Sequence, residues 1–191
     1  MAIEHAILGL LSWRPLSGYD LKKKFADSLA LPWSGNNNQI YNSLVRLHED
    51  GLVTQEIQYQ ENLPARKVYT ITDKGRADLR QWVLTTPELP ELHSPFLIQL
   101  AFTGVLTDEE IDGLLAKYED EIDLELRMQQ EKARRVSETP DRSPREAFLW
   151  KKIVENRLDS YQHELDWVLQ VGAEFQGLKK DWEVGKHGNN G

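Results

Sequence analysis

Hydrophobic periodicity in the first half of the chain predicts four short helices. Apolar residues recur there at steps of three and four, the spacing of one face of an α-helix. Three helices are expected at about residues 3–12, 18–29 and 73–84. A further helix carries the stripe Ile40, Leu44 and Leu47 and ends at Gly51, a residue type that often closes helices. We expect six side chains to point inward: Tyr19, Leu21, Phe25, Ala77, Trp82 and Val83.

Two alternating segments follow Gly51 and predict a β-hairpin. Its strands are expected at 52–59 and 67–71, with the polar loop 60–66 between them. A helix with a polar outer face followed by such a hairpin is the layout of a winged helix-turn-helix. The same order of elements also occurs in small α+β domains that bind no nucleic acid, so the pattern alone leaves function open.

The rest of the chain is expected to be helical. Prolines at 87 and 90 end the pattern of the first half, and a helix at about 93–106 follows. Two long segments, 108–137 and 144–175, keep steps of three and four over many turns, as in coiled-coil-like seams. Their apolar stripes exceed what one helical hairpin buries against itself, which favours a homodimer. The alternative is that this hairpin folds back over the first domain.

These patterns together predict a mainly α fold with a small β-hairpin wing: a winged helix-turn-helix domain followed by an α-helical dimerisation domain. We place the DNA-binding domain at 1–86, the dimerisation domain at 87–183 and a disordered tail, rich in Gly and Asn, at 184–191.

The net charge of −8 is unevenly distributed between the two halves. Residues 1–85 carry ten Lys and Arg against nine Asp and Glu, whereas residues 86–191 carry 13 against 22. A phosphate partner is therefore attracted to the first half and repelled by the second. The chain has no Cys, no apolar run long enough to span a bilayer and no secretory signal at its start, so we expect a cytoplasmic protein without membrane partners.

Amide and basic side chains in the first half are suited to double-stranded DNA. Asn and Gln can pair bidentately with adenine, and Lys and Arg can contact phosphates. The lysine cluster 22–24 precedes the polar-faced helix, where a helix-turn-helix meets the DNA backbone. The candidate base-reading residues are Asn38, Gln39 and Asn42. The candidate phosphate contacts are Lys22, Lys23, Tyr41, Arg66 and Lys67.

The sequence contains no set of residues that is typical of catalysis or of metal binding. None of the five His residues stands at the spacing of a familiar metal motif, and there is no Gly-rich phosphate loop or nucleophile elbow. We therefore expect no enzyme, no cofactor and no metal. The remaining alternative is a winged-helix module or scaffold that binds proteins without DNA.

Aromatic residues of the second half are candidates for an effector pocket. Phe96, Trp150, Tyr161 and Trp167 either fill the core or interface, or line an apolar pocket near the dimer seam. A ligand with a carboxylate needs a basic partner. Lys151, Lys152 and Arg157 lie on the same predicted helix, where we expect them on its outer face.

Three segments, 16–21, 40–52 and 66–76, resemble the PadR family of transcriptional regulators in their order and spacing. The resemblance implies a homodimeric repressor of a palindromic operator, with its third helix in the major groove, and release of DNA by small aromatic or phenolic molecules. Tyr41 matches a family tyrosine near a phosphate, and Arg66 and Lys67 match basic residues of the wing. The segment 37–39 departs from the family pattern, so no operator sequence is carried over.

Overall fold

The structure is a computed structural model that describes residues 2–31, 37–60, 63–89, 94–135 and 142–187. Its backbone divides into two compact units. Unit 1 comprises Met1–Leu89 and Pro140–Ser143, and unit 2 comprises Pro90–Thr139 and Pro144–Gly191. Each unit has its own hydrophobic core.

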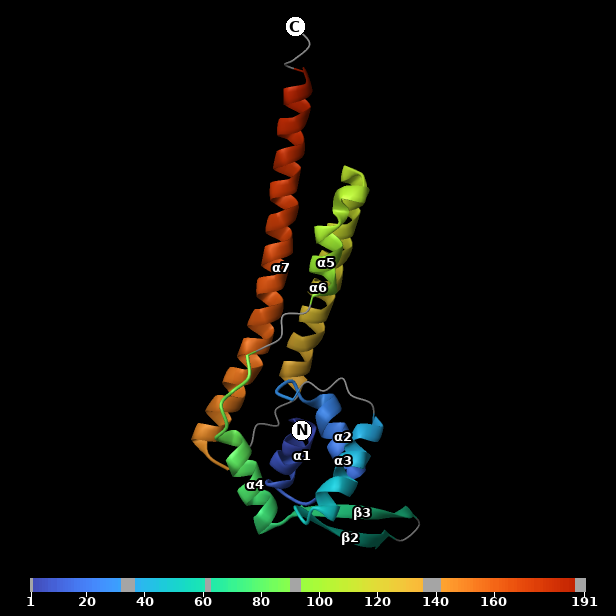
Figure 1. The fold of residues 1–191 in the computed structure, drawn as a ribbon, viewed down its shortest axis with the longest axis vertical. Coiled ribbons are helices and arrows are strands. Elements are labelled where there is room, and N and C mark those ends of the chain that lie inside the picture. The colour runs from blue at the N-terminus through green and yellow to red at the C-terminus, as the bar shows by residue number, and fades with distance from the viewer. Residues whose placement is uncertain (1, 32–36, 61–62, 90–93, 136–141, 188–191) are drawn as a thin grey trace. The chain divides into compact units, whose positions relative to one another are not determined.

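Unit 1 contains four helices and a three-stranded antiparallel sheet within the described residues (Figure 1). In chain order the elements are α1 (Ala2–Leu11), β1 (Leu16–Ser17), α2 (Gly18–Asp27), α3 (Asn37–Glu49), β2 (Val53–Gln60), β3 (Leu63–Ile71) and α4 (Asp73–Val83). The strand order is β1-β3-β2, and β2 and β3 form the expected hairpin. The predicted fold class, mainly α with a small β-hairpin wing, is confirmed.

Local hydrogen bonds fix both ends of the helix-turn-helix pair. Ser17 begins α2 with a capping box, in which its hydroxyl accepts from the Asp20 N–H at 3.2 Å and Asp20 accepts from the Ser17 N–H at 3.0 Å. At the end of α3, Gly51 has a φ of 70°. The Leu52 N–H donates to the Leu47 carbonyl and the Gly51 N–H to the His48 carbonyl. This pair of bonds is a Schellman motif, whose left-handed residue suits glycine.

The core of unit 1 corrects part of the predicted burial. Leu21 and Phe25 of α2 are buried as expected, but Tyr19 is 70% exposed. Two residues apart on a helix point to different faces, so Tyr19 and Leu21 cannot both face the core. In α4, Ala77, Trp82 and Val83 are all exposed. The inward face of α4 instead contains the buried Gly75 and the partly buried Leu79.

The sheet also differs from the expectation. The hairpin was predicted with a loop at 60–66, but β2 continues to Gln60 and β3 already begins at Leu63. Backbone pairing extends as far as Gln60 opposite Leu63, with a register irregularity between Gln58 and Gln60. The two-residue strand β1 was not predicted. It pairs with β3 through Leu16 opposite Tyr69 and Ser17 opposite Val68, and so ties the start of α2 to the wing.

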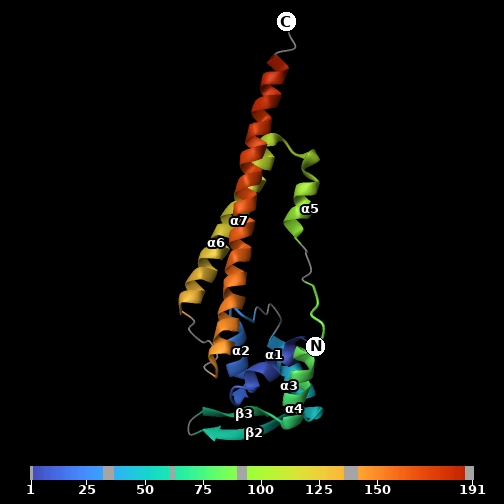
Figure 2. The same cartoon turned by 90° about the vertical axis from the view of Figure 1, so that its left-hand side faces the viewer.

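The regular secondary structure in the described residues of unit 2 is all helical, and its two long helices run antiparallel side by side (Figure 2). Its elements are α5 (Pro95–Ala101), the 3₁₀ turn η1 (Thr103–Val105), α6 (Asp108–Arg135) and α7 (Pro144–His187). Near the start of α6, Asp112 accepts hydrogen bonds from Gln176 and Lys179 of α7. Near the middle, the Tyr118 hydroxyl donates to Glu164 at 2.7 Å.

Two boundaries in unit 2 differ from the sequence prediction. The helix expected at 93–106 is split into α5 and η1 at Phe102, whose φ of −111° and ψ of 18° are not helical. Helix α7 extends past 175 to His187, so 184–187 are helical rather than part of a disordered tail. Extending an existing helix costs less than nucleating one, which explains the extra turns despite Gly177 and Gly185. Residues 136–137 and 188–191, which the predictions also covered, lie outside the described residues.

Candidate nucleic-acid interface

Helix α3 presents an amide-rich face to solvent. Ile40, Leu44 and Leu47 are buried in the core of unit 1 and fix the rotation of the helix. That rotation leaves the candidate base-reading side chains of Asn38, Gln39 and Asn42 exposed. The exposed amides can therefore reach a base edge without moving the helix.

Tyr41 lies on the same helix and packs across the start of α2. A Cβ placed on Gly18 would stand only 2.6 Å from Tyr41 Cε1, so the ring rests directly on the glycine backbone. The side chain is still 47% exposed. Tyr41 is also close enough to the buried Tyr69 of β3 to contribute to its titration: burial first, and Tyr41 second, raise the pKa of Tyr69. Gly18 thus holds the Tyr41 ring at the junction of α2, α3 and the wing.

The basic residues of α2 flank this face. Lys22 and Lys23 are exposed, whereas Leu21 before them and Phe25 after them are buried. The helix is therefore anchored by its apolar side and offers the two lysines to solvent. Such a placement suits contact with a DNA backbone.

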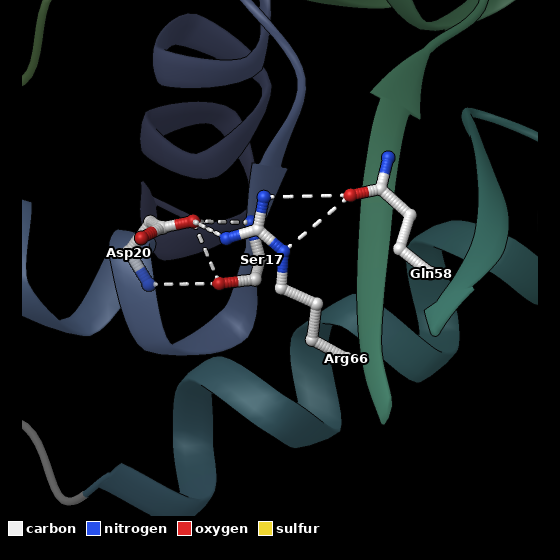
Figure 3. Close-up of polar contacts among 4 residues, drawn as sticks. All are labelled: Ser17, Asp20, Gln58 and Arg66. Carbon is white, nitrogen blue, oxygen red and sulfur yellow. Dashed lines mark hydrogen bonds and ion pairs between the residues drawn. The ribbon is translucent and has the colours of Figure 1, made fainter. Parts of the chain in front are cut away.

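Arg66 on β3 joins the wing to the start of α2 (Figure 3). Its Nη1 lies 4.0 Å from Oδ2 of Asp20, and its Nε and Nη2 each donate to Oε1 of Gln58 at 3.4 Å. Gln58 stands opposite Arg66 in the ladder between β2 and β3. The guanidinium is still partly exposed, with a side-chain exposure of 46%. Lys67 is exposed as well, but as the next residue of a strand it leaves from the opposite face.

Asp20 is ionised in this arrangement. Burial alone would raise the pKa of its carboxyl group, but hydrogen bonds from Ser17 and the charges of Arg66 and Arg14 outweigh it and hold that pKa below 3.8. The Ser17 hydroxyl also donates to Asp20 Oδ2 at 2.7 Å. Asp20 therefore both caps α2 and attracts Arg66. The sequence did not predict that Asp20 attracts Arg66, because an Asp at this position indicates only an acidic residue in the first turn of a helix.

The candidate effector residues of unit 2 separate into different environments. The buried ring of Phe96 stacks on Tyr118 with centroids 3.6 Å apart and meets Trp167 edge-on at 6.2 Å. Tyr161 instead lines a groove between the start of α5, α6 and α7, together with Tyr118. Trp150 is half-buried and is not among the residues that line this groove. Among the described residues of the single chain, the four aromatics therefore do not all line this groove.

The described ranges also bear on metal binding and on membrane insertion. No group of three His, Cys, Asp or Glu residues there could hold a metal ion. Among the same residues, no helix combines the length and apolar character that crossing a bilayer requires.

Comparisons with known proteins show what the chain is similar to. The sequence model of the transcriptional regulator PadR-like family matches residues 7–81. The negative transcriptional regulator PadR of Bacillus subtilis is 34% identical over 113 residues, which cover 59% of this chain and 62% of the relative. The crystal structure of that PadR in complex with operator DNA matches 92% of this chain and 99% of its own, with a TM-score of 0.81 and 26% identity. Residues 7–81 thus match the PadR-like family of transcriptional regulators, and the chain has the fold of B. subtilis PadR.

A second structure of B. subtilis PadR, in complex with p-coumaric acid, matches this PadR-like chain over the same shares with a TM-score of 0.77 and 25% identity. The sequence alignments are shorter than the structural ones. The chain spans less than two thirds of the length of the curated relatives it matches.

Proposed function

We propose that this PadR-like protein is a sequence-specific DNA-binding transcriptional repressor that binds a palindromic operator as a homodimer. The observation that carries the proposal is the exposed face formed by α3, α2 and the base of the wing. It combines the amides Asn38, Gln39 and Asn42 with nearby basic side chains. A B. subtilis relative with the same fold was crystallised with operator DNA, which supports the same use of this face.

Contacts in this face divide into two physical classes. The amides of α3 are assigned to base edges in the major groove, where a good bidentate pair discriminates by about 1–3 kcal/mol. Lys22, Lys23, Tyr41 and Arg66 of this face are assigned to phosphates, which add affinity but little sequence information. Lys67, which leaves β3 on the opposite side, stays a predicted phosphate contact at the edge of the wing. Each lost cationic phosphate contact lowers the salt slope by about one unit.

Dimerisation is assigned to unit 2. Large apolar side chains are exposed on α6 and α7 in the single chain: Leu124, Met128, Phe148, Leu149 and Ile153. Where such side chains form a contiguous patch, they mark an association site. A two-fold dimer would present its two α3 helices to half-sites about one helical turn apart. Light scattering at micromolar concentration should give twice the chain mass of 22.1 kDa, and the single-chain mass would contradict the dimer.

The proposed regulator is released from DNA by a small aromatic or phenolic molecule. The complex of a relative with p-coumaric acid supports this class of effector. The ligand must bind more tightly to the form of the protein that does not bind DNA. A tenfold loss of DNA affinity needs about 1.4 kcal/mol of coupling between the two sites.

A mobility shift with DNA fragments that flank the protein's own gene tests the function. We expect retarded bands at nanomolar protein for at least one fragment, and competition by the same fragment but not by scrambled DNA. A winged-helix module that binds only proteins would give no shift on any fragment at low salt.

A further inference from the structure

Val45 is an apolar side chain on the outward face of α3, where its neighbours are polar. The residue is 52% exposed. Asn38, Asn42 and Val45 follow one another at steps of four and three, so they share one side of the helix. The buried Ile40 and Leu44 lie on the other side. Val45 therefore stands within the face whose amides are assigned to base edges.

Local stability does not favour a valine at this position. Valine is a weaker helix former than alanine, because its branched Cβ loses rotamer freedom against the preceding turn. A buried valine recovers this loss by packing, but Val45 is half exposed. A single exposed apolar residue is common on protein surfaces. What distinguishes Val45 is its place in a polar face, one turn beyond Asn42.

The neighbours of Val45 on α3 have contacts of their own and leave it accessible. Nε of Arg46 lies 3.2 Å from Oε1 of Glu4 on α1, so this guanidinium is held toward α1. The Tyr41 ring, one turn before Val45, rests on the backbone of Gly18. A helical valine strongly prefers one χ1 rotamer, so its two methyl groups point in a fixed direction. Val45 therefore offers solvent a small, rigid apolar surface between these side chains.

The major groove of DNA has one apolar group that matches such a surface. Thymine carries a methyl group there, on C5, and apolar side chains can contact it. Adenine, guanine and cytosine present hydrogen-bond donors and acceptors in the same groove. The side chain of Val45 has no donor or acceptor, so it suits neither a phosphate nor a polar base edge. Its chemistry matches thymine.

The spacing on α3 places such a thymine next to the base that Asn42 reads. Val45 follows Asn42 by three residues, which is about 4.5 Å along the helix axis. Successive nucleotides of one DNA strand are about 3.4 Å apart along the duplex. On a helix that lies along the groove, the two side chains therefore reach neighbouring base pairs.

We propose that Val45 is a specificity-determining residue that contacts the C5 methyl group of a thymine, one base pair from the base that Asn42 contacts. The proposal rests on the proposed DNA-binding function. It adds a discrimination that the amides of α3 cannot make. Thymine and uracil present the same hydrogen-bonding edge, so only a contact with the methyl group tells them apart.

An exchange of thymine for uracil tests the contact. The probe is the DNA fragment flanking the protein's own gene, amplified once with thymidine triphosphate and once with deoxyuridine triphosphate in its place. Every base pair keeps its hydrogen bonds, whereas the C5 methyl groups are lost. Removing one buried methyl contact should weaken binding about three- to fivefold. A dimer with this contact in both half-sites should therefore bind the uracil fragment about tenfold more weakly.

Two variants assign the effect to Val45 in mobility-shift titrations of the full-length protein. Val45→Ala should bind the thymine fragment about tenfold more weakly than the wild type and distinguish the two fragments less than about twofold. Alanine is the better helix former at this exposed site, so the variant should fold. Val83→Ala at the end of α4 is the matched control, since Val83 is 65% exposed. It should keep the wild-type preference for thymine.

The two fragments and the two proteins form a double-mutant cycle, which separates this contact from other effects of uracil on the DNA. Equal affinity of the wild type for both fragments would overturn the proposal. The same loss on uracil DNA in Val45→Ala as in the wild type would overturn it as well. Failure of the wild type to bind the thymine fragments at all is a separate outcome, which would remove the proposed function and the role of Val45 with it.

Discussion

The Nη1 atom of Arg66 on the wing lies 4.0 Å from the Oδ2 atom of Asp20 in the first turn of α2. The contact joins a candidate phosphate-binding cation to a carboxylate that also caps its helix. Arg66 is therefore positioned before DNA arrives, and Asp20 competes with a phosphate for it.

Substitutions of Arg66 and of Asp20 should have opposite effects on DNA affinity. Arg66→Gln should weaken binding to all sequences alike and reduce the salt slope by about one unit. Asp20→Asn keeps an acceptor for the cap but removes the competing charge, so it should raise affinity by about two- to fivefold, the range of an exposed ion pair. Anisotropy titrations at several salt concentrations measure both. Arg80→Gln on the exposed side of α4 is the charge-matched control. If Arg80→Gln changed the salt slope as much as Arg66→Gln does, the assignment of Arg66 to a phosphate would be contradicted.

Gly18 should be needed for DNA binding although it offers no side chain. In Gly18→Ala the new methyl group would stand 2.6 Å from the Tyr41 ring and force the ring out of its place. We expect at least about tenfold weaker DNA binding, equivalent to about 1.4 kcal/mol. Gly9→Ala in α1 is the control, because a Cβ there meets nothing within 4 Å. Equal DNA affinities for the two variants would show that the Tyr41 ring position does not matter.

The end of α3 should depend on the left-handed backbone of Gly51. Gly51→Ala forces an L-residue to a φ of 70° and should lower the free energy of unfolding by about 1–2 kcal/mol. Gly51→Asn should lose less, since Asn tolerates this conformation best among the other residues. Urea denaturation of the three proteins measures their free energies of unfolding, which should decrease in the order glycine, asparagine, alanine. Equal stability of the alanine variant and the wild type would contradict it.

Acid should remove the contribution of Asp20 to stability. Its pKa is lowered in the folded state, so its stabilising effect is fully present above the unfolded value near 3.8 and is lost as the pH falls through the folded value. The difference in Tm between the wild type and Asp20→Asn should be largest near neutral pH and shrink below about pH 4. A constant difference down to the most acidic pH measured would mean that the charge of Asp20 has no such role.

Sequence periodicity predicted the elements better than their orientation. The stripe of Ile40, Leu44 and Leu47 was predicted correctly because three buried positions at helical steps define one rotation. Tyr19 was assigned inward on hydrophobicity, against its helical phase. The strand β1 is only two residues long, too short to show alternation, and it forms because β3 lies beside it.

The two polar arrangements of most interest depend on tertiary structure. Arg66 and Asp20 are far apart in the sequence, and the pairing of β1 with β3 brings their elements together. Arg157 was expected on an outer face because the apolar steps of three and four in this helix fall on its neighbour Leu158 and on Tyr161. In the structure both the partly buried Leu158 and Arg157 face inward, so the buried face is wider than the stripe.

One comparison tests the central claim most directly. It measures how tightly the wild type and the Asn42→Ala variant bind a DNA fragment that flanks the protein's own gene. The account predicts that the wild type prefers this fragment to scrambled DNA. It also predicts that Asn42→Ala loses about 1–3 kcal/mol on the fragment while its affinity for scrambled DNA and its salt slope stay unchanged. Equal affinity of the wild type for the fragment and for scrambled DNA, with no effect of Asn42→Ala on either, would contradict sequence reading by α3.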